Sequence, residues 1–359
     1  MRLLVWALAW AARGAAYQNP RKGLGGDAVP VVMASDVDCL PGLIVAISSI
    51  YNSTASPERV QVHVVSTLAD APIVRSIVAC ALPGLVSRVR VIPFEAPDDL
   101  PLSRRRRAHA TQHRRLLVPL NYARFFISWI LQDAWAKVVY LDVDVVVTGD
   151  IADLYDSALV GGGAGSPALP VAAVPRAAGQ KLRLAQSVGT NAAARAALIR
   201  RGVAVNATDR KRPSTFLDDF NAGVVVIDLE RWTALNLTDA TLDWMALNAK
   251  HDLYTKGSNP PLVLALRDRF ERVDQRWNCP ARPRGTPLHE DCANPGILHL
   301  TGFRKPWLDV GDRDPRWLAA APPRLGNCLF FYRSRLPWSG LLPARYQGPP
   351  HWGRRHNRA

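Results

Sequence analysis

The fold is decided by a stretch that reads Lys137-Val138-Val139-Tyr140-Leu141-Asp142-Val143-Asp144-Val145-Val146-Val147. Its first part, 137–141, is an apolar, β-branched run that predicts a buried strand. Two carboxylates one residue apart follow, and a second β-branched run encloses them. Charge in such surroundings is costly unless a cation or hydrogen-bond donors compensate it. Asp142 and Asp144 are therefore candidate ligands for a divalent ion whose remaining positions are filled by the phosphates of a ligand.

Strand and helix patterns alternate on the N-terminal side of this stretch. Apolar runs and helical spacing predict strands at 31–34, 60–65 and 89–94 and helices at 43–50, 72–82 and 121–135. This order predicts an α/β fold: a single Rossmann-like domain with a mainly parallel sheet and helices on both faces. In such sheets ligands bind at the carboxyl ends of the strands. That rule selects Ser35-Asp36, after the first strand, and Asp142-Val143-Asp144.

On the C-terminal side of this stretch, predicted strands and helices continue and are followed by a segment without such a pattern. Strands are predicted at 222–228 and 297–300, and helices at 240–249 and 261–267. The glycine-rich stretch 161–165 lacks the spacing of a phosphate-binding loop and is read as a plain loop. No repeat and no long linker divides the chain. We therefore expect one domain over 29–309 and an irregular Pro/Arg-rich tail over 310–359.

A second segment that carries chemistry is His299-Leu300-Thr301-Gly302-Phe303-Arg304-Lys305-Pro306-Trp307. A histidine at a strand end can add an imidazole nitrogen to the two carboxylates, a set that suits Mn²⁺ better than Ca²⁺. Gly302 permits a close backbone approach, and Lys305 can offset a phosphate charge. Taken alone, DxD occurs by chance in many chains and His299 is typical of a core histidine. The whole pattern HxxGxxKPW is far more specific.

With these motifs the chain resembles the family 8 glycosyltransferases, the retaining group that includes glycogenin and bacterial galactosyltransferases. Two stretches, 274–278 and Pro260-Pro261, make it similar in particular to eukaryotic glycosyltransferase 8 domain-containing proteins and plant galacturonosyltransferase-like proteins. The resemblance implies a GT-A fold, a UDP-sugar donor and Mn²⁺, with Mg²⁺ as the second choice. It runs from Val31 to Trp307 and is carried by 34–36, 122–125, 141–144, 220–223 and 299–307.

The same resemblance implies roles for individual residues. The metal ligands would be Asp142, Asp144 and His299, and the donor-binding residues would be Ala34, Ser35, Asp36, Arg124, Val143, Asn221, Ala222, Gly302 and Lys305. Within this set, residues 34–36 would meet the uridine, Gly302 and Lys305 the diphosphate, and Arg124, Asn221 and Ala222 the sugar. Taken singly, Arg124 is typical of a surface ion pair, Asn221 of a turn and Asp36 of a loop cap.

The chain also departs from the family. Bacterial members carry an Asp-Gln pair near the reacting sugar, where this sequence has Gly257-Ser258-Asn259-Pro260-Pro261. No catalytic nucleophile or carboxamide is therefore assigned. Retention by front-face attack, in which the leaving phosphate accepts the acceptor's proton, is a hypothesis that needs neither.

Composition and charge exclude several classes of protein. The chain of 359 residues is 48% hydrophobic and 21% charged, which excludes a disordered, collagen-like or polytopic membrane protein. Its five cysteines include no CxxC pair, so structural zinc is not expected. The net charge of +15 is concentrated in the stretch 104–115 and in the tail. Neither region interleaves aromatic residues in a way that suggests base stacking, so solvated loops or attraction of an anionic acceptor or membrane surface are favoured over nucleic acid.

The first residues indicate the compartment. Arg2, an apolar run over 3–12 and a small-residue exit at 14–16 match a secretory signal peptide over 1–16, or a signal anchor if it is not cleaved. Three glycosylation sequons, at Asn52, Asn206 and Asn236, agree with secretion. In that environment Cys279 and Cys292 flank a loop of suitable length for a disulfide, and one cysteine stays unpaired. We expect residence in the Golgi or ER lumen.

Three functions remain open at this point. The favoured one is a retaining, metal-dependent glycosyltransferase that moves a hexosyl or uronosyl group from a UDP-sugar to a carbohydrate or glycoconjugate acceptor. A catalytically silent nucleotide-sugar-binding protein of the same fold is the alternative, because the Asp-Gln pair is missing. A basic protein that binds nucleic acid or polyanions is the third, and it would depend on the tail.

Overall fold

The computed structural model describes residues 27–102, 118–131, 134–160, 168–176, 179–255, 257–281, 292–302, 305–307 and 314–333. They form two compact units. The first unit contains 95–138 and 158–273, together with Asp27 and Ala28, and the second contains 29–94, 139–157 and the described residues from Asp274 on. The expected signal peptide, the basic stretch 104–115 and the glycine-rich stretch 161–165 lie outside the described residues.

The sheet of the second unit is parallel. Its strands run in the order β4-β1-β2-β3, with β1 (Val29–Ala34), β2 (Val60–Thr67), β3 (Val89–Phe94) and β4 (Lys137–Leu141). The register pairs Val31 of β1 with Val62 on one side and with Val139 on the other. Nearly all residues of β1 and most residues of β2 are buried, as expected for strands of a sheet that is covered on both faces. The parallel order predicted from the alternating pattern is confirmed.

Helix α2 (Leu40–Ser53) connects β1 to β2 and α3 (Ala71–Ala81) connects β2 to β3, with short 3₁₀ helices at Val37–Cys39 and Pro83–Arg88. Helix α5 (Ile151–Ser157) comes later in the chain, after β4 and β5. Proline in the first turn starts both α2 and α3, where its missing N–H has no intrahelical partner to lose. Leu43, Ile47 and Ile50 of α2 are fully buried, so the predicted apolar stripe faces the core.

A small second sheet in the same unit brings together two distant segments. It is formed by β12 (Cys279–Pro280), β13 (Ile297–His299) and β5 (Val145–Val147), in that order, and β12 follows the 3₁₀ helix Gln275–Asn278. Strands β13 and β5 are antiparallel and pair His299 with Val145. This register places His299 next to the turn between β4 and β5, which contains both aspartates of the DxD motif.

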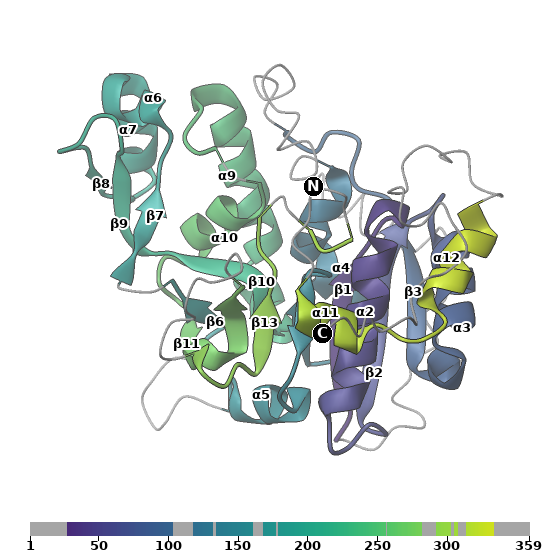
Figure 1. Cartoon of the computed structure of the whole chain (residues 1–359). Helices are drawn as coiled ribbons and strands as arrows, with labels where there is room; N and C mark the ends of the chain where they lie inside the picture. The colour runs from purple at the N-terminus through teal and green to yellow at the C-terminus, as the bar shows by residue number, and fades with distance from the viewer. Residues whose placement is uncertain are drawn as a thin grey trace, which may run out of the picture. The chain divides into compact units, whose positions relative to one another are not determined.

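The part of the tail that the structure describes is not irregular, which corrects the sequence prediction. It contains α11 (Pro315–Ala320), which packs against α2, and α12 (Leu325–Arg333), which packs beside α3 (Figure 1). Trp317 of α11 is fully buried, and Cys328 of α12 forms a disulfide with Cys80 of α3. The buried Trp317 and Leu325 stabilise these helices despite the Pro/Arg-rich surroundings.

The predicted disulfide between Cys279 and Cys292 is confirmed. With the bond between Cys80 and Cys328, it leaves Cys39 as the single cysteine outside a disulfide. Both bonds lie within the second unit. Cys80 and Cys328 are separated by 248 residues, so their bond closes a much longer loop of the chain than the other one does.

The first unit has its own strands and helices. Its strands are ordered β11-β6-β10, where β10 (Phe220–Asp228) is antiparallel and β11 (Glu271–Arg272) is parallel to β6 (Val171–Pro175). The helices are α4 (Ile127–Leu131), α8 (Leu229–Ala234), α9 (Leu237–His251) and α10 (Asn259–Leu266). The helix predicted over 121–135 is mostly a 3₁₀ helix, Pro119–Phe126, followed by the short α4. Six of its eight residues are buried, so tertiary burial rather than an amphipathic α-helical face fixes this segment.

The sequence did not predict the remaining part of the first unit. Strands β7 (Lys181–Arg183), β9 (Ser214–Asp218) and β8 (Val205–Asn206) form an antiparallel sheet, with α6 (Gln186–Thr190) and α7 (Ala192–Arg200) beside it (Figure 1). These strands are short and carry few apolar residues, so they lack a clear two-residue period.

No helix among the described residues combines the length and apolar character needed to cross a bilayer.

Candidate metal centre and donor site

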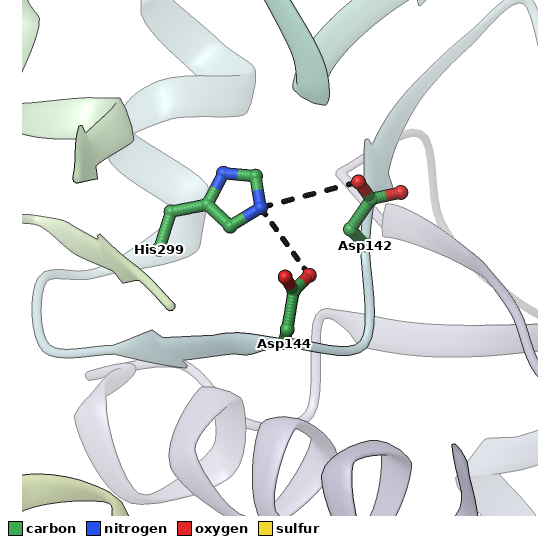
Figure 2. A group of neighbouring side chains, drawn as sticks. All are labelled: Asp142, Asp144 and His299. Atoms are coloured by element: carbon green, nitrogen blue, oxygen red, sulfur yellow. Dashed lines mark ion pairs between the residues drawn. The ribbon is translucent and has the colours of Figure 1, made fainter. Parts of the chain in front are cut away.

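The turn between β4 and β5 and the end of β13 bring three metal-ligating side chains together. Nε2 of His299 lies 3.2 Å from Oδ1 of Asp144 and 3.9 Å from Oδ2 of Asp142 (Figure 2). One ligand atom from each residue lies within 4.8 Å of the other two. The backbone N–H of Leu300 donates to the carbonyl of Asp144 at 2.7 Å, which ties the two segments directly. The structure therefore gathers the three residues that the sequence proposed as metal ligands.

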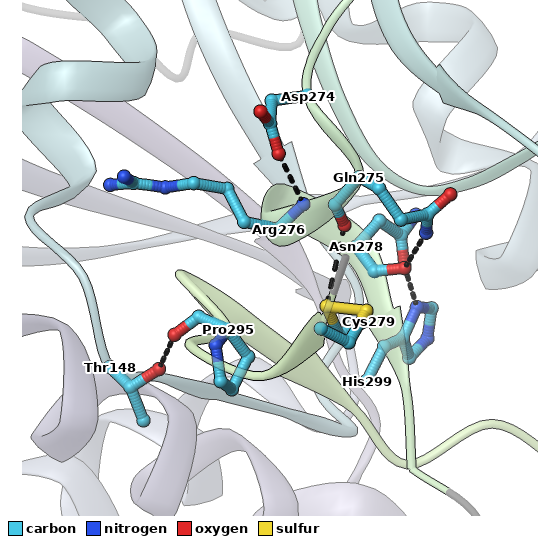
Figure 3. Close-up of a disulfide and its surroundings, with 9 residues drawn as sticks. Thr148, Asp274, Gln275, Arg276, Asn278, Cys279, Pro295 and His299 are labelled. Carbon is cyan, nitrogen blue, oxygen red and sulfur yellow. Dashed lines mark hydrogen bonds between the residues drawn. A yellow bond between two sulfur atoms is a disulfide. The ribbon is translucent and has the colours of Figure 1, made fainter. Parts of the chain in front are cut away.

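Asn278 orients the imidazole of His299. Nδ1 of His299 lies 2.8 Å from Oδ1 of Asn278, and both side chains are buried (Figure 3). An amide oxygen accepts hydrogen bonds only, so Nδ1 donates its proton to Asn278, and Nε2 is the ring nitrogen that faces the carboxylates. Asn278 lies in the stretch that carries the family resemblance but was not assigned a role. Asparagine is common in turns, so no sequence signal distinguished it.

The donor set fits a divalent cation. Nε2 of His299 and the carboxylates of Asp142 and Asp144 converge on one point, where a divalent ion would balance the two negative charges. His299 is 2% exposed and Asp144 is 7% exposed, so water compensates this charge poorly. Two carboxylate oxygens and one imidazole nitrogen, with a hydrogen-bond partner behind the imidazole, are a ligand set that suits Mn²⁺.

Lys305 pairs with Asp144. Its ammonium group contacts the Asp144 carboxylate and donates to the carbonyl of Leu300 at 3.0 Å. Burial alone would raise the pKa of Asp144, but the charges and hydrogen bonds of His299 and Lys305 outweigh it and hold the pKa well below its usual range. Asp144 is therefore ionised at any ordinary pH. Lys305 was proposed to bind the diphosphate, and in the structure its ammonium group contacts Asp144, a proposed metal ligand.

Strand β12, which lies next to His299 of β13, is held in place by a disulfide and by packing contacts. Cys279, which directly follows Asn278, forms the disulfide with Cys292. Its Sγ lies 3.4 Å from the carbonyl oxygen of Gln275 (Figure 3). Residue 296 is a glycine because a Cβ there would lie 2.7 Å from the Trp277 ring. These contacts fix the backbone that carries Asn278.

Two glycines around the HxxGxxKPW segment have different roles. Gly302 has φ +97°, a backbone conformation that favours glycine, and a Cβ there would meet nothing within 4 Å among the described residues. A close approach of its backbone to a diphosphate stays a prediction. Gly42 of α2 is the residue that permits a close approach. A Cβ on it would lie 2.5 Å from the ring of Trp307, which is 2% exposed. Trp307 therefore anchors the segment against α2.

The residues proposed to meet the uridine follow β1, in the second unit. The hydroxyl of Ser35, which is buried, donates to the carbonyl of Asp36. Oδ1 of Asp36 accepts from the N–H of Cys39 at 3.0 Å and caps the short helix that follows. Burial, and then the charge of Asp38, raises the pKa of Asp36. The loop-cap role is thus present in the structure, whereas contact with uridine stays a prediction.

The residues proposed to meet the sugar lie in the first unit. Arg124 is 5% exposed and Nη1 donates to the carbonyl of Ala222 at 2.7 Å, so it is not a surface ion pair. Oδ1 of Asn221 accepts from the N–H of Gly223, the local bond of a turn residue. Ala222 is also held by Asn259, whose Oδ1 accepts from its N–H at 2.8 Å.

Asn259 extends this network to a buried carboxylate. Its Nδ2 donates to Oδ1 of Asp219 at 3.0 Å, and Nε of Arg176 donates to Oδ2 of the same carboxylate at 2.8 Å. Asn259 lies in the stretch where the bacterial Asp-Gln pair is absent. Sequence reasoning left this stretch without a role, and the structure shows that it fixes the backbone of Ala222.

Comparison with known proteins identifies the family. A family model described as Glycosyl transferase family 8 matches residues 30–311, and the chain belongs to this family of glycosyltransferases. Probable galacturonosyltransferase-like 3 and 6 of Arabidopsis thaliana are 29% and 28% identical over 292 residues, which cover 80% of this chain and 76% of each relative. The crystal structure of the galactosyltransferase LgtC with donor and acceptor sugar analogs matches with a TM-score of 0.54 and 21% identity, over 88% of this chain and 100% of that chain. This likeness confirms the GT-A fold.

Proposed function

We propose that this protein is a retaining, metal-dependent glycosyltransferase that moves a hexosyl or uronosyl group from a UDP-sugar to a carbohydrate or glycoconjugate acceptor. The observation that carries the proposal is the convergence of Asp142, Asp144 and Nε2 of His299, with Asn278 orienting the imidazole. Membership of glycosyl transferase family 8 supports it.

Asp142, Asp144 and His299 would hold the ion, Mn²⁺ by preference and Mg²⁺ otherwise. A bound divalent ion supplies Lewis-acid stabilisation of the departing diphosphate. Lys305 would turn from Asp144 to the diphosphate, because the ion then neutralises the carboxylate in its place. Gly302 would complete the diphosphate contacts.

The other donor contacts are proposed residue by residue from the family resemblance. Ala34, Ser35, Asp36 and Val143 would bind the nucleoside, with the Asp36 carboxylate accepting the uracil N–H. Arg124, Asn221 and Ala222 would contact the sugar. The hydrogen bonds of Arg124 and Asn259 to the backbone of Ala222 support a preorganised sugar-binding segment.

Retention is proposed to follow front-face attack. The acceptor hydroxyl oxygen bonds to the anomeric carbon on the face that the phosphate leaves, and the departing phosphate oxygen takes the hydroxyl proton. No side-chain nucleophile is required. NMR of a fresh product shows the outcome: the α-anomer from an α-linked donor supports this route, and the β-anomer contradicts it.

Three further features belong to the same proposal. Residues 1–16 would direct the chain into the secretory pathway, most plausibly the Golgi or ER lumen, and the two disulfides are consistent with an oxidising compartment. The catalytic domain would span 29–309. The tail from 310 would extend the second unit through α11 and α12.

A silent nucleotide-sugar-binding protein remains the second candidate, favoured by the missing Asp-Gln pair. A screen of UDP-sugars for Mn²⁺-dependent UDP release by the purified chain separates the two. Release from one donor, even slow hydrolysis without an acceptor, supports the transferase and identifies its sugar. Binding of UDP with Mn²⁺ but no release from any donor, tested with a panel of acceptor oligosaccharides, supports the silent protein.

A further inference from the structure

The small sheet of the first unit, β7-β9-β8, carries several exposed side chains. Leu182 of β7 and Thr215 of β9 are buried, whereas Lys181, Arg183 and Phe216 are exposed. The register pairs Arg183 with Ser214 and Lys181 with Asp218, so Phe216 lies on β9 between the two paired positions. Its side chain is 58% exposed, which is unusual for a phenylalanine.

Cations gather beside this phenylalanine. The turn between β8 and β9 contains Arg210-Lys211-Arg212, all exposed. The carbonyl of the following residue, Pro213, accepts from the N–H of Leu184 at 2.9 Å, so the turn lies beside the end of β7, which carries Arg183. We call Arg183, Arg210, Lys211, Arg212 and Phe216 the cationic hairpin.

The charge of the cationic hairpin is not neutralised by neighbouring acids. The sequence from 179 to 212 contains eight lysines and arginines and a single acidic residue, Asp209. Two other cations of the region are paired, Lys181 with Asp218 and Arg201 with Asp243. Among the described residues, no ion pair involves Arg183 or the three cations of the turn. A concentrated positive potential therefore surrounds an exposed aromatic ring.

We propose that the cationic hairpin binds an anionic, uronate-containing oligosaccharide, as part of the acceptor of this enzyme. Guanidinium groups bind carboxylates in a planar, two-bond geometry, and an exposed aromatic ring packs against the apolar face of a sugar. The choice of a sugar chain over nucleic acid rests on the proposed function, since the chain belongs to a glycosyltransferase family. A neutral acceptor would leave the four cations without a role.

The test is the affinity of the full chain for a purified oligogalacturonide of about ten residues, measured by calorimetry at two salt concentrations. We expect the R210Q/K211Q/R212Q variant to bind about tenfold more weakly, because three exposed charges contribute modestly each. The matched control is R75Q/K250Q/R324Q, which removes the same number of lysines and arginines from exposed positions that are not part of the cationic hairpin. It should lose less than twofold.

A second variant, Phe216→Ala, separates stacking from charge. It should weaken binding several-fold and leave the salt dependence unchanged, because no charge is lost. Equal losses in the two triple variants, equal affinity for a neutral galactan oligosaccharide, or tighter binding of an RNA of equal charge would each overturn the proposal.

The proposed function can fail independently of this surface. UDP release from the donor without acceptor should be the same in the R210Q/K211Q/R212Q variant and in the unmodified chain. If neither the variant nor the unmodified chain releases UDP but the unmodified chain still binds the oligogalacturonide, the proposed transferase activity is contradicted and the proposed binding surface is not.

Discussion

Two carboxylates in this protein each lie between two basic side chains, and they differ chiefly in their surroundings. Asp144 contacts His299 and Lys305 in the second unit, where the side chains are 10%, 2% and 18% exposed. Asp218 contacts Lys181 and Arg272 in the first unit, where the two cations are 43% and 54% exposed. Both carboxyl groups have a lowered pKa.

The causes of the two shifts differ. At Asp218, hydrogen bonds from Lys181 and Arg272 lower the pKa with little opposition from burial. At Asp144, burial acts strongly in the opposite direction, and the interactions with His299 and Lys305 together overcome it. Water can replace either partner of Asp218 at small cost, whereas a lost partner of Asp144 leaves a buried charge. The first arrangement is typical of a surface, and the second of a functional site.

The largest expected effect is that of Asp144→Asn. The change removes a charged metal ligand, so Mn²⁺ affinity should fall by about 100-fold or more, with turnover lost in parallel. Titration of Mn²⁺ followed by electron paramagnetic resonance measures the affinity. Asp153→Asn, at an exposed position in α5 of the same unit, is the matched control and should bind Mn²⁺ normally. Equal affinity in the two variants would remove Asp144 from the metal centre.

Asn278→Leu should weaken Mn²⁺ binding by about 10- to 100-fold, because the imidazole loses the acceptor that fixes its tautomer. Asn278→Asp keeps an oxygen acceptor and should lose less than threefold. The same resonance titration applies, and thermal unfolding of both variants checks the fold. If the leucine variant binds Mn²⁺ as tightly as the unmodified chain, the orientation of His299 does not depend on Asn278.

Lys305→Ala should change two affinities in opposite directions. The ammonium group competes with a metal ion for the Asp144 carboxylate, so Mn²⁺ alone should bind about threefold to tenfold more tightly without it. UDP with Mn²⁺ should bind more weakly, because a cation near the diphosphate is lost. Calorimetry with and without UDP measures both. A parallel loss of both affinities would mean that Lys305 supports the metal centre only structurally.

The smallest effect is expected at the exposed cluster. Asp218→Asn should lower the free energy of unfolding by about 0.5 kcal/mol at neutral pH, since its cations are solvated. The pKa of Asp218 is lower in the folded chain, so this stabilisation is present above the unfolded pKa of about 3.9 and is lost as pH falls through the folded value. Urea unfolding at pH 7 and near pH 3 measures it. An effect that is undiminished at the lower pH would show that ionisation is not its source.

The parts of the fold predicted from the sequence are those with a strong local pattern. Strand β3 was predicted with its exact bounds, and β4 likewise, because buried β-branched runs leave little choice of conformation. Ligand chemistry suggested that His299 joins Asp142 and Asp144, and the family resemblance supported it, but no local pattern could, since 155 residues separate Asp144 from His299 (299 − 144).

The parts that were missed depend on long-range contacts. Asn278 has an ordinary turn sequence and acquires its role from a strand that lies 21 residues away. Trp307 reaches Gly42, and Cys80 reaches Cys328, across most of the chain. The tail helices are stabilised by burial of Trp317 and Leu325, whereas their local composition is typical of irregular structure.

The central claim is that Asp142, Asp144 and His299 hold a divalent ion. Crystals grown with Mn²⁺ and UDP, measured at the manganese absorption edge, test it directly by locating the ion through its anomalous scattering. We expect one peak about 2.2 Å from a carboxylate oxygen of Asp142, from one of Asp144 and from Nε2 of His299. A peak elsewhere, or bound UDP with no peak between these three side chains, would contradict the account.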